Sequence, residues 1–144
     1  MNLLLNSMNQ QLFQWDTFHT KLHQFHEQME RLNMRTNSLA IKEYIQEASK
    51  RTRDISEHIH AVSGHSSLFD ITKSDNPDFQ LTKTNHSHSS IIEEVTADLT
   101  AMGSEIKKVI ERANAVSDQK TVKLFISIRQ SVEKLLWMIN VYMK

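Results

Sequence analysis

Hydrophobic residues recur along the chain at intervals of three and four residues, in four separate segments. Such spacing places the apolar side chains on one face of an α-helix. The pattern therefore predicts four amphipathic helices, over roughly residues 8–33, 38–63, 89–115 and 118–143. The four stripes are Trp15, Phe18, Leu22, Phe25, Met29 and Leu32; Ile41, Ile45, Ala48, Thr52, Ile55, Ile59 and Val62; Ile92, Val95, Leu99, Met102, Ile106, Val109 and Ala113; and Phe125, Ile128, Val132, Leu135, Ile139 and Tyr142.

Residues typical of helix ends separate these segments. They are the polar turn 33–37, the stop at Gly64, the capping box formed by Ser90 and Glu93, and the N-cap candidates Ser117 and Asp118. A long connection follows Gly64, and its stretch SLFDITK is compatible with a short helix. Short, long and short links are typical of an all-α, ferritin-like four-helix bundle with a crossover between the second and third helices. We expect one such domain over residues 1–144.

Composition and charge narrow the classes of function. The 144 residues are 39% apolar and 24% charged, with 17 basic and 17 acidic side chains, so the whole chain offers no net field to attract nucleic acid or an anionic membrane. The absence of cysteine excludes disulfides and thiolate metal sites. Because no signal-peptide pattern and no run of 18 apolar residues occur, we expect a cytoplasmic protein that does not enter a membrane.

Histidines supply the candidate metal chemistry. His19, His23 and His26 lie one residue out of phase with the first apolar stripe, so they flank the core at a spacing that lets imidazoles share a metal ion. The alternative is a row of histidines that is solvated or packed at an interface. His86 and His88, expected in a loop, are a second candidate pair. A di-iron centre inside the bundle is not expected, because it needs two Glu-x-x-His motifs and only one was found, at Glu57 and His60.

Three segments together resemble the Dps family, the twelve-subunit mini-ferritins of bacteria. They are KLHQFHEQMERLN at 21–33, EYIQEASKRTRDISEHIHAVSG at 43–64 and FISIRQSVEKLLWMINVYM at 125–143. Family members show K-[IL]-H-x-x-H-W on the first helix, D-E-x-A-E-R on the second and an aromatic-rich last helix. The resemblance runs from about Asn9 to Met143. It implies a ferritin fold, iron storage, protection from peroxide and assembly into a dodecamer.

The resemblance also implies where iron would bind, at a site that two subunits share. His26 matches the family's first-helix histidine ligand, and Glu57 matches the glutamate from the neighbouring subunit. The other three ligand positions are replaced. The second-helix histidine falls at Ser38, and two acidic ligands fall at Lys42 and Arg53.

These replacements change the sign of charge, because Arg53 is always protonated and Lys42 nearly so. Arg53 and Glu57 have the i, i+4 spacing of an ion pair, and we hypothesise that the guanidinium occupies the space of the metal ion. Ferroxidase activity is then lost or strongly reduced. In the alternative interpretation Arg53 turns to solvent and a rearranged site forms.

That rearranged site would recruit His23, His60 or Glu27, which follows the first-helix histidine where the family has tryptophan. We expect no resident cofactor, and iron binding only as the resemblance implies it.

The start of the last helix corresponds to the family's acidic pores. It retains Asp118 but adds Lys120 and Lys123, which would repel ferrous ions. The first basic residue is Lys21, so there is no basic N-terminal arm and DNA binding should be weak or absent. The expected partner is a second copy of the chain, a related active subunit or another protein. In the alternative interpretation, the chain is a dimeric helical module that binds another protein.

Overall fold

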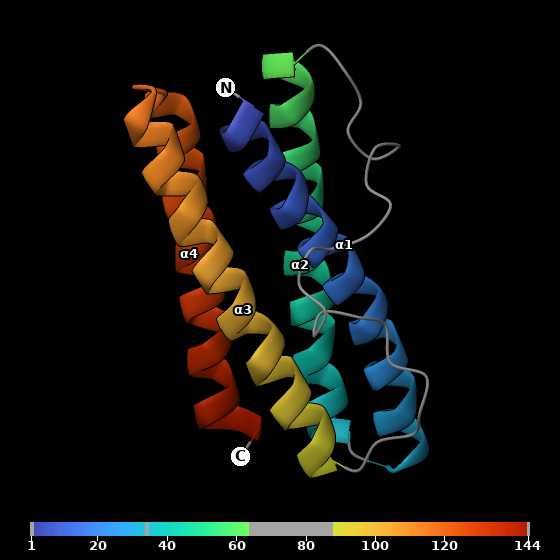
Figure 1. The fold of residues 1–144 in the computed structure, drawn as a ribbon. Helices are drawn as coiled ribbons and strands as arrows, with labels where there is room; N and C mark the ends of the chain where they lie inside the picture. Colours follow the sequence, from blue (N-terminus) through green and yellow to red (C-terminus); the bar gives the residue numbers. More distant parts are fainter. Residues whose placement is uncertain (1, 34, 64–87, 144) are drawn as a thin grey trace.

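The computed structural model describes residues 2–33, 35–63 and 88–143 (Figure 1). They form four long helices, α1 (Asn2–Arg31), α2 (Arg35–Ser63), α3 (His88–Ala115) and α4 (Gln119–Met138), and a π-helical segment, η2 (Ile139–Met143). No strand occurs among these residues.

The four helices pack side by side as a bundle. α1 packs against α2 and α3, and α4 packs against α3 and α2. α1 and α2 run in opposite directions, as do α3 and α4, whereas α2 and α3 run in the same direction (Figure 1). This arrangement requires a connection that returns along the length of the bundle, and it confirms the predicted ferritin-like fold. The SLFDITK stretch and His86 lie outside the described residues.

Two helix starts differ from the expectation. α1 begins at Asn2 instead of near residue 8, because the buried Leu4 and Met8 extend its apolar face toward the N-terminus. α3 begins at His88, so Ser90 already lies within the first turn and cannot be the N-cap; the predicted capping box is wrong.

The start of α4 confirms the prediction of Asp118 as its N-cap. The carboxylate accepts hydrogen bonds from the Thr121 backbone N–H at 3.2 Å and from the Thr121 hydroxyl at 2.7 Å. These bonds satisfy a backbone donor that the first helical turn leaves unpaired.

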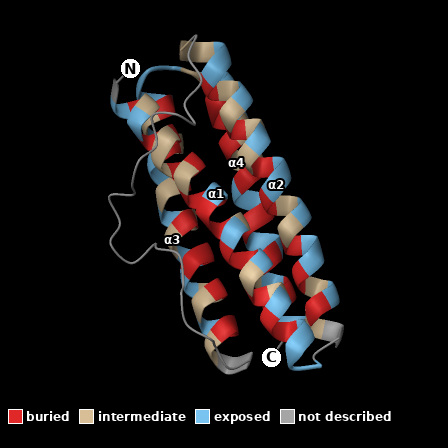
Figure 2. Cartoon of the chain, turned by 90° about the vertical axis from the view of Figure 1, so that its right-hand side faces the viewer, coloured by how far each residue is buried: buried red, intermediate tan, exposed pale blue. Residues whose placement is uncertain are grey.

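The core follows the predicted stripes, and the buried residues lie on the sides of the helices that face the centre of the bundle (Figure 2). Among the stripe residues, Leu32 is 52% exposed, Ile45, Thr52 and Val62 are partly buried, and the side chain of Tyr142 lies outside the described part of the structure. Trp15 is fully buried and donates its indole N–H to Gln11, while Trp137 is 57% exposed and does not belong to the core. Within the described part of the chain, no helix is long and apolar enough to cross a membrane.

Candidate metal-binding site

His26 lies near the C-terminal end of α1, opposite the start of α2. Its Nε2 atom is 3.4 Å from Oε1 of Glu30, one turn further along α1. The same carboxylate oxygen accepts a 2.9 Å hydrogen bond from the hydroxyl of Ser38, which is buried on α2. One carboxylate therefore lies between the two positions at which the Dps resemblance places histidine ligands.

The Nε2 atom of His26 is itself buried and has no hydrogen-bond partner among the described residues. Its separation from Glu30 is longer than a normal hydrogen bond, so the contact is an electrostatic approach and not a bond. A buried nitrogen without a partner costs free energy unless it is protonated beside the carboxylate or binds a cation. The pair of His26 and Glu30 therefore suits a divalent ion, although it supplies only two ligands.

Lys42 and Arg53, which fall at two acidic ligand positions in the Dps resemblance, are both exposed on α2. Among the ion pairs formed within residues 2–33, 35–63 and 88–143, none joins Arg53 to Glu57. The hypothesis of an ion pair between them within the chain is wrong, and both side chains are exposed.

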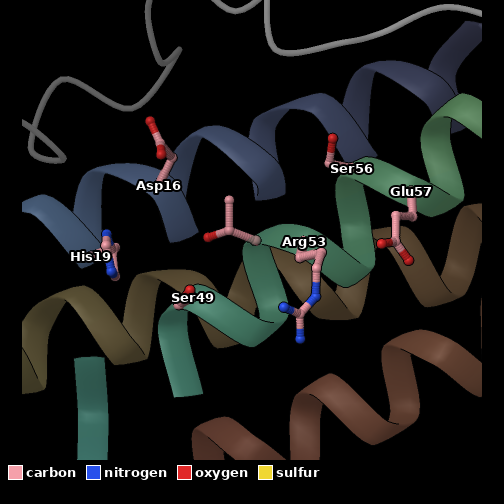
Figure 3. Close-up of a pocket in the computed structure, with 7 residues that line it drawn as sticks. Asp16, His19, Ser49, Arg53, Ser56 and Glu57 are labelled. Carbon is pink, nitrogen blue, oxygen red and sulfur yellow. The ribbon is translucent and has the colours of Figure 1, made fainter. Parts of the chain in front are cut away.

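Arg53 and Glu57 instead line a shallow groove between α1 and α2, with a volume of about 340 Å³. Figure 3 shows that Asp16 and His19 reach this groove from α1 and that Arg53 and Glu57 reach it from α2. The Asp16 carboxylate and the Arg53 guanidinium point in opposite directions (Figure 3). The groove is therefore lined by charges of both signs that do not neutralise one another directly.

A single chain does not unite the two retained family positions. Glu57 and His19 line the same groove but lie at its opposite ends (Figure 3), and His26 lies seven residues further along α1 than His19, on the order of 10 Å along the helix axis. No group of three metal-ligating side chains comes together in the described part of the chain. A site that uses both His26 and Glu57 needs a second copy of the chain.

The remaining candidates are dispersed. His23 is exposed and stacks edge-on against His19, with ring centroids 4.7 Å apart. Glu27 is exposed and lies 4.0 Å from Arg31, and His60 is exposed on α2. His88 is the first residue of α3.

In the region that corresponds to the family pore, Asp118 is occupied by its capping role. The hydrogen bond from the Thr121 hydroxyl lowers the pKa of the Asp118 carboxyl. His58 of α2 lies 2.7 Å from the same hydroxyl, and burial lowers the pKa of its imidazole. Lys120 and Lys123 are exposed. The Asp118 carboxylate thus caps the start of α4, and the two exposed lysines lie within the next turn of the helix.

Glu30 is the site residue that sequence reasoning missed. Its i, i+4 spacing from His26 is a signal that could have found it. Its hydrogen bond with Ser38 has no such signal, because it depends on how α2 packs against α1.

Comparison with known proteins identifies the family to which this chain belongs. A model of the ferritin-like domain matches residues 5–144. The chain belongs to the ferritin-like family. This ferritin-like chain is 23% identical over 140 residues to general stress protein 20U of Bacillus subtilis (strain 168), with 97% of each chain covered.

Two further relatives carry the Dps description. DNA protection during starvation protein 2 of Bacillus anthracis is 24% identical over 140 residues, covering 97% of this chain and 96% of that protein. The crystal structure of Dps from Staphylococcus aureus superposes with a TM-score of 0.77 at 26% identity, covering 98% of this chain and 95% of that one. These similarities confirm the resemblance to the Dps family.

Proposed function

We propose that this chain is a subunit of a Dps-like mini-ferritin cage that serves iron storage and protection from peroxide, and whose own ferroxidase activity is lost or strongly reduced. Membership of the family supports the general role. The loss of activity rests on the side chains at the family's ligand positions.

The observation that carries the proposal is that Ser38 is buried and hydrogen-bonded to Glu30. The serine occupies the family's second-helix histidine position and donates its hydroxyl to Glu30 at 2.9 Å. A neutral hydroxyl that is already engaged as a donor is a poorer ligand for ferrous iron than an imidazole nitrogen. One of the two histidines of the family site is therefore functionally absent.

The charges at Lys42 and Arg53 act in the same direction. Both are exposed cations where the family has acidic ligands. Electrostatic repulsion from an exposed charge extends over roughly 8 Å at physiological ionic strength, so neither cation needs to occupy the metal position to oppose a divalent ion. Lys42 and Arg53 are exposed on the surface where a partner subunit would complete the site, so they would still repel a divalent ion there.

A second candidate function is a slow ferroxidase with a rearranged site. The buried and unpaired Nε2 of His26, with the Glu30 carboxylate 3.4 Å away, favours it. In an assembled dimer, Glu57 of a neighbouring copy would add a second carboxylate. His23, Glu27 and His60 are further candidates for this role, and all three are exposed.

For the assembly, we propose a cytoplasmic homo-oligomer of twelve subunits, alone or together with a related active subunit. A dodecamer has about twelve times the 16.8 kDa mass of the chain, which light scattering distinguishes from a dimeric protein-binding module. We expect weak or no DNA binding, because the 144 residues carry no formal net charge. Lys120 and Lys123 would make the pore region unfavourable for entry of ferrous ions.

The experiment is anaerobic titration with ferrous iron followed by oxidation with peroxide. Under the proposal the wild-type protein binds less than one iron per site and accelerates oxidation little. A triple variant, Ser38→His, Lys42→Asp and Arg53→Asp, restores the family's ligand types and should oxidise iron much faster. Lys50→Asp, a charge reversal at another exposed position of α2, is the matched control and should change neither binding nor rate.

The rate of iron oxidation by the wild-type protein distinguishes the two candidate functions. If it oxidises iron at a substantial rate, and His26→Ala and Glu30→Gln each abolish that rate, the slow ferroxidase is correct and the loss of activity is not. If the triple variant stays inactive while remaining folded and assembled, the explanation based on ligand positions fails.

A further inference from the structure

His19 and His23 form a close pair of imidazoles on the outer side of α1. They are spaced i, i+4, their ring centroids are 4.7 Å apart, and their planes are nearly perpendicular at 85°. His19 is half-buried at the groove between α1 and α2, and His23 is exposed. Among the described residues, neither ring takes part in a hydrogen bond or an ion pair.

The His19 ring is available as a ligand at neutral pH. Burial lowers the pKa of His19, and the nearby His23 lowers it further, while Asp16 opposes the shift. His19 is therefore neutral under physiological conditions and keeps a lone pair for a metal ion. A neutral His19 ring avoids the repulsion that two imidazolium rings at this distance would suffer.

We propose that His19 and His23 form a chelating site for a late first-row divalent metal ion of the Cu²⁺ or Zn²⁺ class. A metal–nitrogen bond is about 2.0–2.1 Å long, so two nitrogens that share one ion lie at most about 4.2 Å apart. Rings with centroids 4.7 Å apart reach that separation by rotation of the side chains alone. Residues four apart lie above one another on a helix, so the backbone does not have to move.

The ligand set decides which metal the site favours. Imidazole nitrogens suit copper, zinc and nickel, and affinity rises along the series from Fe²⁺ to Cu²⁺. With two protein ligands, the other coordination positions take water or an exchangeable ligand. Asp16, close enough to influence the titration of His19, adds a negative charge that favours a cation.

This site is separate from the candidate iron site. His26 faces Glu30 instead of the histidine pair. The inference therefore does not depend on whether the protein stores or oxidises iron, and each can fail without the other.

The test is titration of the purified, assembled protein with Cu²⁺. Competition with a chelator measures the affinity for Cu²⁺, and electron paramagnetic resonance counts the nitrogens that coordinate it. We expect one equivalent of Cu²⁺ per chain with two imidazole nitrogens. His19→Ala and His23→Ala should each remove one nitrogen and weaken that equivalent by at least about tenfold, since even the loss of an outer partner of a metal ligand costs about 10–100-fold. His60→Ala, which removes an exposed imidazole from α2, should leave the equivalent unchanged.

Several results would overturn the assignment. In the first, the wild-type protein does not bind Cu²⁺ stoichiometrically. In the second, the His19→Ala and His23→Ala variants bind Cu²⁺ as wild type does, because the ion lies on other histidines. Anaerobic Fe²⁺ at an equal concentration should not displace the ion, and displacement would refute the proposed metal class. Circular dichroism of each variant checks the fold, which substitution of these partly or fully exposed rings should not alter.

Discussion

The ammonium group of Lys21 on α1 lies 2.9 Å from Oδ2 of Asp98 on α3, and both side chains are almost completely buried. Glu94, one turn before Asp98, lies 3.0 Å from the same ammonium and is partly exposed. The pair joins the two helical hairpins of the bundle. A buried cation is tolerated only because these carboxylates surround it.

Removal of one member of this pair should be more harmful than removal of both. We expect Lys21→Met to lower the free energy of unfolding by about 3 kcal/mol or more, because Asp98 is left without its partner. Lys21→Met combined with Asp98→Leu should recover most of that loss. Urea denaturation of the two single variants and the double variant forms a complete cycle. Additive effects of the two substitutions would contradict a coupled pair.

Stability should also depend on pH through Asp98. Burial raises the pKa of its carboxyl from the usual 3.8 to about 6, although Lys21 opposes the shift. Between these values the folded protein holds a proton that the unfolded chain has released, so this group makes stability fall as pH rises from about 4 to about 6.

Urea unfolding of wild type and Asp98→Asn across that pH range measures this contribution. Asp98→Asn lacks the titrating group, so the difference in unfolding free energy between the two proteins should change steadily from pH 4 to 6 and then level off. A difference that stays constant with pH would show that Asp98 titrates normally.

The N-cap of α4 gives a local prediction. Asp118→Ala removes the acceptor for the Thr121 backbone N–H and should lower the free energy of unfolding by about 1 kcal/mol. Gln119→Ala, one residue further on and exposed, is the control and should change it little. Thermal unfolding measures both. If the two variants lose the same stability, the cap makes no specific contribution.

Gly103 offers a substitution that should stabilise the protein. A Cβ atom at this position would lie 3.9 Å from Cγ1 of Val132, an ordinary van der Waals distance. Gly103→Ala in the middle of α3 should therefore raise the free energy of unfolding by about 0.5–1 kcal/mol, because alanine loses less backbone entropy in a helix. Ala97→Gly, at an exposed position of the same helix, should lower it by a similar amount. A lower melting temperature for Gly103→Ala would indicate a steric conflict with α4.

The sequence predicted the apolar part of the fold because helix burial follows a fixed period. Trp15, Leu99 and Phe125 lie at the centre of their stripes and are fully buried. The period does not say which polar residue beside a stripe is covered by a neighbouring helix. The burial of Lys21 and Arg51 therefore could not be predicted from the period.

Arg51 illustrates the limit. Its ion pairs with Glu47 and Asp54, both at 3.2 Å, are local contacts within α2 that spacing can suggest. Its 2.8 Å hydrogen bond to the Ser131 hydroxyl joins α2 to α4 and depends on the rotation of both helices. The candidate iron site has the same limitation, since the approach of Ser38 to Glu30 joins two helices and the position of Glu57 relative to His26 involves a second chain.

The parallel direction of α2 and α3 has a consequence for how the chain folds. α1 with α2, and α3 with α4, each form an antiparallel hairpin, so contacts within each hairpin are local and we expect them to form early in folding. Docking of the two hairpins then creates the shared core and buries Lys21 against Asp98. Each half carries an apolar face that only the other half covers. A chain cut between these halves would thus yield two complementary fragments that reconstitute the bundle when they are mixed.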